Sequence, residues 1–312
     1  METTAVKMKH VEPAFADATS QLDISKYVIF GVPFDATVSH RRGAAGAPEA
    51  IRLETYNFET YLMELEVELK DVDICDLGDI SVANLEEEQG KLLEKIDLLS
   101  GSILDREKTP FMMGGEHSIT EGAVDAFMKR YARHGGLVVV FDAHLDFRSE
   151  YMDNPHSHAC TSRRIAEKWG TDSICVIGAR SASREEMMAA KKLDLRYASA
   201  RKVRSQGIID LLDQWDTGFA IRDRPIYLSV DIDGLDPSFA PGTGTPEPWG
   251  LSSFHLLSLV EGLYTNIQAM DVVEVSPGIE PYITPGIAGK LIRQVIGLKE
   301  MKIRNPTWLE KV

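Results

Sequence analysis

Leu137 to Asp146 read LVVVFDAHLD, an apolar run of five residues followed by a short polar segment. The run is rich in β-branched residues, as is typical of a buried strand in a parallel sheet. Side chains alternate along an extended chain, so Asp142, His144 and Asp146 share one side. Open α/β sheets bind ligands at the carboxyl ends of their strands. This stretch therefore predicts an α/β fold with a polar site at that edge of the sheet.

Two further segments follow the same pattern. The strand-like run Phe111 to Met113 precedes GGEHS, which contains His117. The run Ile226 to Val230 precedes DIDGLD, in which Asp231 and Asp233 are again two residues apart. Three strands are thus expected to bring four aspartates and two histidines to one place.

Such a cluster predicts a site for two metal ions. Four carboxylates in one cleft repel one another too strongly to stay ionised unless cations neutralise them, and two divalent ions balance four aspartates. Oxygen ligands with some imidazole and no thiolate favour Mn²⁺, with Co²⁺ and Zn²⁺ as alternatives. The prediction is two Mn²⁺ per subunit.

Two other interpretations of these acids are less favoured. Asp is common in caps and turns at strand ends, but three independent motifs in the same position favour a metal cluster. An EF-hand calcium loop would need a polar ligand and then a glycine where this chain has Leu235 and Asp236.

The motifs together resemble those of the ureohydrolase family of arginases, agmatinases and related guanidino-compound hydrolases. The resemblance covers nearly the whole chain. The first segment and the specificity region look like agmatinases rather than arginases, and SHACTSRR (157–164) resembles agmatinases of the archaeal type. The matching segments are GVPFDATVSHRRGAAGAPEAIR (31–52), GGEHS (114–118), DAHLD (142–146), SVDIDGLDP (229–237), APGTGTPEP (240–248) and AMDVVEVSP (269–277).

The resemblance implies the roles of individual residues. Asp142 and Asp231 would bridge the ions, and Glu274 matches the glutamate that binds the guanidinium group by paired hydrogen bonds. Catalytic roles are implied for Glu274, Asp146 and a loop histidine. One ion would be held by His117, Asp142, Asp146 and Asp231, and the other by Asp142, His144, Asp231 and Asp233.

Expulsion of an amine requires a proton donor, for which histidine is suited by its pKa. His158 is the candidate, because it lies in the loop where the family carries a mobile histidine. The family often has His-Gly at this point, whereas this chain has Ala159 after the histidine. His156 is the alternative, and either residue could instead be an ordinary surface histidine.

The three cysteines indicate no disulfide. Cys160 lies close to His158, which raises the alternative of a thiolate nucleophile, but the metal motifs would then have no purpose. Cys75 and Cys175 occur in apolar stretches and are expected in the core. Without paired cysteines or an apolar signal segment, a reducing, cytoplasmic setting is predicted.

Composition and pattern predict one domain, residues 1–312, with residues 1–20 as an irregular arm. The fold expected is a three-layer α/β/α arrangement, arginase-like, with a mostly parallel sheet of about eight strands. A Ser118/Glu121 capping box and Pro285 at a first helical position mark helix starts. Strands are predicted at Tyr27–Val32, Val72–Leu77, Phe111–Met113, Leu137–Phe141, Ser173–Gly178, Leu195–Ala198, Ile226–Val230 and Ala269–Val275.

The formal net charge of -14 argues against nucleic-acid binding and favours cationic substrates. No apolar run is long enough to span a membrane. The loop from Phe147 to His156 contains Glu150 and Asp153, which suit a cationic substrate tail, and Arg148, which suits a carboxylate. Trp249 replaces a small residue common in the family and would narrow or reshape the tail pocket.

The hypothesis is hydrolysis of agmatine to putrescine and urea. Aminopropylagmatine, arginine and guanidinobutyrate are alternative substrates for the same chemistry. An inactive metal-binding regulatory homologue and a mononuclear zinc deacetylase are alternatives of other classes, and the full set of ligands argues against both. The resemblance also implies a homo-oligomer, either a trimer or a hexamer.

Overall fold

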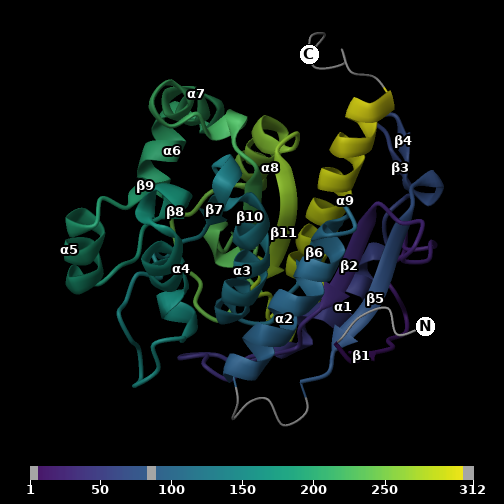
Figure 1. Cartoon of the computed structure of the whole chain (residues 1–312), viewed down its shortest axis with the longest axis horizontal. Helices are drawn as coiled ribbons and strands as arrows, with labels where there is room; N and C mark the ends of the chain where they lie inside the picture. The colour runs from purple at the N-terminus through teal and green to yellow at the C-terminus, as the bar shows by residue number, and fades with distance from the viewer. Residues whose placement is uncertain (1–5, 83–88, 305–312) are drawn as a thin grey trace.

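Nine strands form one sheet in the computed structural model, which describes residues 6–82 and 89–304. The strand order is β1-β5-β2-β6-β11-β10-β7-β8-β9 (Figure 1). The strands of this sheet are β1 (Met8–Lys9), β2 (Tyr27–Gly31), β5 (Ile74–Ile80), β6 (Thr109–Met113), β7 (Leu137–Phe141), β8 (Ile174–Ala179), β9 (Arg196–Ser199), β10 (Ile226–Asp231) and β11 (Ile267–Val273). A separate hairpin pairs β3 (Tyr61–Leu62) with β4 (Val67–Glu68).

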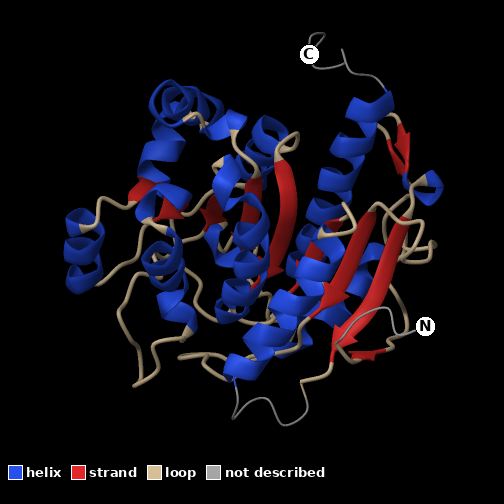
Figure 2. Ribbon diagram, viewed as in Figure 1, coloured by secondary structure: helices blue, strands red, loops and turns tan. Residues whose placement is uncertain are grey.

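Helices cover both faces of this sheet (Figure 2). Apolar side chains of α2 (Gln89–Leu104), α3 (Thr120–Tyr131), α4 (Thr161–Trp169) and α5 (Arg184–Lys192) belong to one core cluster. The other face packs against α1 (Ala47–Thr55), α6 (Ala200–Gln206), α7 (Ile208–Phe219), α8 (Ser253–Leu263) and α9 (Ile283–Arg304). Alternating side chains of each strand enter the two clusters, because successive residues point to opposite faces.

The predicted three-layer fold is confirmed. Eight strands are parallel, and each of the eight predicted runs forms a strand with boundaries shifted by at most a few residues. The prediction missed β1, which lies within the segment predicted as an irregular arm and pairs antiparallel with the end of β5. Phe15 of the same segment is buried.

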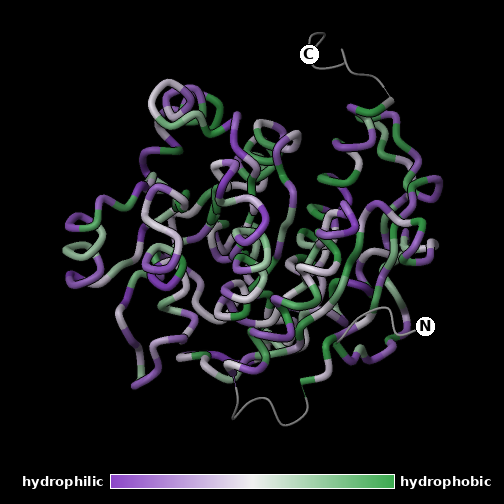
Figure 3. The backbone as a smooth tube through the Cα atoms, in the orientation of Figure 1, coloured by the Kyte–Doolittle hydropathy of each residue, from purple (hydrophilic) through white to green (hydrophobic). Residues whose placement is uncertain are grey.

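The central strands are the most buried part of the molecule. Every residue of β7 and β10 is buried, whereas hydrophilic and hydrophobic stretches alternate along outer helices such as α5 (Figure 3). Strand β7, with the sequence LVVVF, is apolar throughout. Parallel strands covered on both faces require such continuous apolar runs. Across residues 6–82 and 89–304, no helix combines the length and the apolar character that crossing a bilayer requires.

Both predicted helix starts are wrong in detail. Ser118 donates its hydroxyl to the buried Glu116 carboxylate instead of capping a helix, and α3 begins at Thr120. The Glu121 carboxylate pairs with His156. Helix α9 begins at Ile283, so that Pro285 is its third residue, because Glu280 accepts hydrogen bonds from the backbone N–H groups of residues 282–284.

Candidate active site

Four neighbouring strands bring the candidate residues together. In the register of the sheet, Val230 of β10 is paired with Phe141 of β7, so the aspartates that follow or end these strands reach the same edge. Strand β11 lies beside β10, β6 lies beside β11, and these two strands lead into the other segments. The residues delivered are His117 after β6, Asp142, His144 and Asp146 after β7, Asp231 and Asp233 at the end of β10, and Glu274 after β11.

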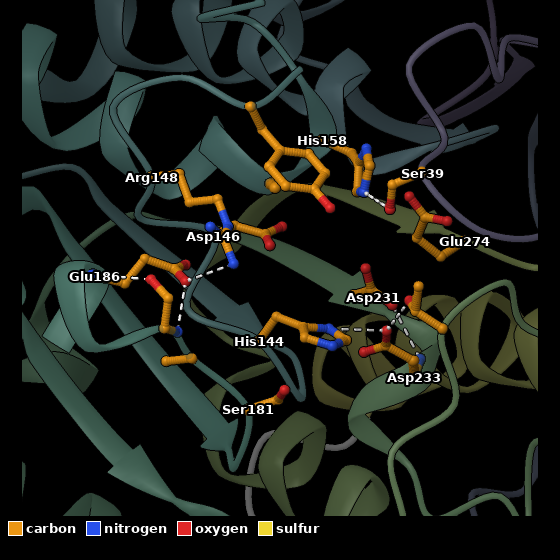
Figure 4. A pocket seen from close by; sticks show the side chains of 15 residues that line it. Ser39, His144, Asp146, Arg148, His158, Ser181, Glu186, Asp231, Asp233 and Glu274 are labelled. Carbon is orange, nitrogen blue, oxygen red and sulfur yellow. Dashed lines mark hydrogen bonds and ion pairs between the residues drawn. The ribbon is translucent and has the colours of Figure 1, made fainter. Parts of the chain in front are cut away.

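These side chains surround a cavity of about 210 Å³ (Figure 4). His144, Asp146, Asp231, Asp233 and Glu274 line it directly. His117 and Asp142 lie beneath them and have no exposed surface. Their convergence creates a strongly acidic, water-accessible pocket whose floor is buried.

One group of possible ligand atoms is centred on His117. Its Nδ1 atom lies 2.9 Å from Asp146 Oδ2, 3.3 Å from Asp142 Oδ2 and 3.4 Å from Asp231 Oδ2. All four side chains are buried. Three carboxylate oxygens around one imidazole nitrogen are the donor set that a divalent ion such as Mn²⁺ accepts.

A second group is centred on His144 and shares Asp142 with the first. His144 Nδ1 lies 3.1 Å from Asp233 Oδ2 and 3.6 Å from Asp142 Oδ1. Asp142 Oδ2 is buried and accepts no hydrogen bond from the described residues, although His117 Nδ1 is 3.3 Å away. A buried carboxylate oxygen needs a partner, and a metal ion between the two groups would supply one.

The electrostatics of the cluster are those of a cation site. Burial, together with the charge of Asp142, raises the pKa of Asp146 to about 7. Burial and the carboxylates of Asp233 and Asp142 raise the pKa of Asp231 well above its usual value. Burial alone would lower the pKa of His144, but the two aspartates beside it raise that pKa to about 12. Divalent ions would displace these protons, because metal ligands bind deprotonated.

The orientation of His117 depends on residues that sequence reasoning missed. His117 Nε2 lies 3.2 Å from Ser229 Oγ, and Ser229 donates to the buried Asp271 at 2.7 Å. Asp271 also accepts from Tyr227 and Thr120. Holding one ring nitrogen directs the other at the ligands. The sequence does contain a signal for these residues. Ser229 and Asp271 stand inside apolar strands, where a polar side chain needs a hydrogen-bond partner.

Glu274 reaches the cavity from a strained backbone position. Its φ is 63°, in the left-handed region that non-glycine residues rarely adopt. Its Oε1 atom accepts from the His117 backbone N–H at 2.8 Å. Burial and the nearby Glu116 raise the pKa of Glu274 to about 8. Asp146 is also left-handed, with a φ of 47°, and such strain gathers at functional sites.

The two candidate histidines of the loop have different surroundings. His158 lines the cavity, and burial, followed by the charges of His117 and His144, lowers its pKa to about 4 although Thr37 opposes this. His156 lies outside the cavity lining, with half of its side chain exposed and its Nδ1 2.7 Å from Glu121. Only His158 can therefore contact a molecule bound in this cavity.

Arg148 and Glu186 line the end of the cavity away from Glu274 (Figure 4), and Tyr151 also belongs to the lining. Arg148 Nη2 lies 3.5 Å from Glu186 Oε2, and its guanidinium lies over the Tyr151 ring. Glu150 and Asp153 of the same loop are exposed.

One sequence expectation near the cavity fails, and the disfavoured thiolate alternative gains no support. Trp249 is 78% exposed and does not line the cavity, so it does not narrow the pocket of this chain. Its backbone turns at a φ of 63°, and its carbonyl accepts from Arg204. Cys160 is also no part of the lining, and burial raises the pKa of its thiol to about 11, which disfavours the thiolate.

Arg180, which directly follows β8, was also missed. Its guanidinium donates to the carbonyls of Asp233 at 2.7 Å, Gly234 at 3.1 Å and Leu235 at 3.1 Å. It also donates to the carbonyl of Glu247 at 2.7 Å. One side chain thus joins the loop carrying a candidate metal ligand to the segment 240–248. Backbone acceptors leave no pattern in a sequence, so the role could not be seen there.

We expect Arg180→Lys to lower the free energy of unfolding by about 2–4 kcal/mol, because an ammonium cannot reach all these carbonyls and a lost hydrogen bond from a charged donor costs about 1.5–3 kcal/mol. Urea denaturation measures the change. Arg184→Lys, at an exposed position in α5, is the control and should stay within about 0.5 kcal/mol of the parent protein. Equal losses in both variants would contradict the stated role.

Comparison with known proteins gives consistent matches. The model of the arginase family matches residues 25–297. The chain is 34% identical to N(1)-aminopropylagmatine ureohydrolase of Thermococcus kodakarensis over 88% of each chain. It is 33% identical to the agmatinase of Pyrococcus horikoshii, covering 90% of this chain and 94% of that one. A solved agmatine ureohydrolase of Thermoplasma volcanium matches with a TM-score of 0.86 and 36% identity, over 95% of this chain and 97% of that one.

Proposed function

The chain belongs to the arginase family, and from this premise we propose that it hydrolyses the guanidino C–N bond of agmatine to give putrescine and urea. The observation that carries the proposal is the meeting of six candidate metal ligands at and directly beneath one cavity, which Glu274 also lines. The relatives named for agmatine and aminopropylagmatine support the same reaction class.

Two Mn²⁺ ions are proposed for the cluster. His117, Asp142, Asp146 and Asp231 would hold one, and Asp142, His144, Asp231 and Asp233 the other. When bound, such ions supply a nucleophile at neutral pH by lowering the pKa of water from 15.7 to about 7. The shared position of Asp142 between the two groups of possible ligand atoms supports a bridging role.

Glu274 is proposed to bind the substrate guanidinium. The carbon of that group is a poor electrophile because its charge is spread over three nitrogens, so reaction depends on close placement. The charge of a bound guanidinium would lower the raised pKa of Glu274, and the resulting carboxylate can form paired, charge-assisted hydrogen bonds to it. The strained φ of Glu274 and the hydrogen bond from His117 hold the carboxylate in one place.

His158 is proposed to move the proton. Its lowered pKa leaves the ring neutral before reaction, so it can accept a proton when water attacks. It then donates that proton to the departing nitrogen as the C–N bond breaks. The leaving group is thereby released as a neutral amine rather than as an unstable anion.

The tail end of the cavity supports a substrate without a carboxylate. Arginine and guanidinobutyrate both carry one, and its recognition requires an uncompensated cation or several donors. Arg148 is the cation that lines this end, but Glu186 already neutralises it. The Tyr151 hydroxyl can accept a hydrogen bond from an amine, whereas the Arg148 guanidinium already lies over the ring. Agmatine and its aminopropyl derivative therefore fit this end better.

Urea release by the purified, Mn²⁺-loaded protein tests the proposal. Agmatine, aminopropylagmatine, arginine and guanidinobutyrate are compared, with a metal-stripped sample as control. Metal-dependent urea with the highest kcat/KM on agmatine supports the proposal. A higher kcat/KM on arginine or guanidinobutyrate contradicts the assigned substrate, and no urea from any of them contradicts the assigned reaction.

Glu274→Gln should lower kcat/KM for agmatine about 100-fold, equivalent to about 2.7 kcal/mol, because an amide forms weaker bonds to a guanidinium than a carboxylate does. Steady-state urea formation measures this effect, and the metal content should not change. Glu185→Gln, at an exposed position in α5, is the control. Equal kcat/KM in the two variants would contradict the proposed role of Glu274 in binding the substrate.

We also propose that residues 1–312 act as one domain, that copies assemble as trimers or hexamers, and that the enzyme works in the cytoplasm on a small cationic substrate without nucleic-acid or membrane partners. Several large apolar side chains are exposed and available for assembly, among them Phe254 and Tyr282. Light scattering of the purified protein measures the subunit number. A monomer at micromolar concentration would contradict the proposed assembly.

A further inference from the structure

The N-terminal loop that follows β2 lies against the loop that carries His158. The His158 backbone N–H donates to Thr37 Oγ1 at 3.0 Å, and His158 Nδ1 lies 3.4 Å from the same oxygen. On the other edge of the ring, His158 Nε2 lies 3.3 Å from Ser39 Oγ (Figure 4). One distant segment therefore contacts both ring nitrogens and the backbone of His158, and the neighbouring Ser157 Oγ also lies 3.3 Å from Nδ1.

Thr37 is itself fixed by the buried Glu116. The Thr37 backbone N–H donates to Glu116 Oε2 at 2.7 Å, and the Thr37 hydroxyl lies 2.5 Å from Glu116 Oε1. Glu116 has no exposed surface, and its backbone N–H donates to Phe34 at 2.8 Å. Because Glu116 directly precedes His117, the segment that positions His158 is tied to the segment that carries a candidate metal ligand.

The direction of these hydrogen bonds determines how the imidazole is held. A hydroxyl has one hydrogen and two lone pairs, and Thr37 directs its hydrogen at Glu116. It can therefore only accept from His158, once from the backbone N–H and once from Nδ1–H, and the Ser157 hydroxyl can accept from the same Nδ1–H. Nε2 is left as the nitrogen that gains and loses a proton, on the side where Ser39 lines the cavity.

We propose that Thr37, anchored by Glu116, is a positioning residue that sets the tautomer and the orientation of the His158 ring. The inference rests on the proposed role of His158 in proton transfer. In that step the C–N bond breaks, its electron pair stays on the departing nitrogen, and that nitrogen takes the proton from His158 Nε2. The ring returns to its neutral form with Nδ1–H still bonded to Thr37.

Thr37→Val tests the inference, because it keeps the shape of the side chain and removes the hydroxyl. We expect kcat on agmatine to fall about 10- to 100-fold, as general acid–base catalysis contributes about 10²–10⁴-fold in full. KM and metal content should stay within about threefold of the parent values, since Thr37 neither lines the cavity nor belongs to the candidate metal ligands. Thr37→Ser restores the hydroxyl and should recover kcat to within about threefold of the parent enzyme.

Two kinetic outcomes would overturn the inference. One is a kcat for Thr37→Val within twofold of the parent. The other is an equal loss in Thr37→Ser, which would show that the methyl group matters rather than the hydroxyl. Parent turnover of agmatine is measured in the same experiment, so a failure of the proposed function is seen separately.

A second measurement needs no substrate. The ¹⁵N shifts of the His158 ring, assigned by comparison with His158→Gln in the diamagnetic Zn²⁺-loaded protein, report which nitrogen carries the proton. The parent protein and Thr37→Ser should show the Nδ1–H form, and Thr37→Val should lose it. Identical shifts in all three proteins would overturn the inference even if the parent enzyme releases urea.

Discussion

Replacing Asp142 by Asn is expected to lower kcat for urea formation by at least about 10³-fold, because the amide cannot balance the charge of two divalent ions. Without those ions the pKa of water returns from about 7 toward 15.7, and the nucleophile is lost. Asp142 lies between His117 and His144 and belongs to both groups of possible ligand atoms. We therefore also expect fewer than two Mn²⁺ per chain, measured by elemental analysis alongside activity.

The substitution should leave the fold in place. Asn keeps an oxygen that can accept from the His144 backbone N–H, as Asp142 does at 2.6 Å. Asp172→Asn, at an exposed position, is the matched control and should keep both its metal content and its kcat. Full turnover by the Asp142 variant with two bound ions would refute the proposed role of Asp142 in holding them.

His158→Gln is expected to lower kcat about 10²–10⁴-fold, because the departing nitrogen loses its proton donor. The matched variant is His156→Gln, for which we expect kcat within threefold of the parent. His156 is half-exposed and faces Glu121 outside the cavity. Initial rates of urea release from agmatine measure both variants.

The His156→Gln variant is expected to be less stable than the parent, so the assay temperature must lie below its melting temperature. Glu121 is buried, and removal of its partner costs about 1–3 kcal/mol of stability without touching the cavity. Melting curves of both variants separate this loss from a loss of catalysis. A large fall in kcat for His156→Gln below its melting temperature, with normal turnover by His158→Gln, would reverse the assignment.

Much of the fold could be predicted because it follows from local patterns. Central parallel strands such as β7 are apolar runs bounded by polar segments, and each of the eight predicted runs forms a strand, including the partly buried β9 at the edge of the sheet. Strand β1 could not be predicted in this way, because its two residues contain no pattern and depend on pairing with β5. The predicted capping box failed for a similar reason, since Ser118 found a stronger partner in the buried Glu116.

The candidate site was likewise predicted only in part. The six predicted ligands lie together in the structure because each follows or ends an apolar strand, and neighbouring parallel strands end at one edge. The residues that hold those ligands were not predicted. Asp271 acts through Ser229, and Arg180 binds backbone carbonyls, so neither has a motif.

The sequence by itself determined the layered α/β fold, the identity of the clustered acids and histidines, and the likeness to the ureohydrolases, because strand periodicity and short motifs are local properties of the chain. Only the tertiary structure decided which loop histidine faces the cavity, that Arg148 is neutralised by Glu186, and that Thr37 holds His158. Each of these depends on contacts between segments far apart in the chain, where distance and burial, not residue type, decide which partner is reached.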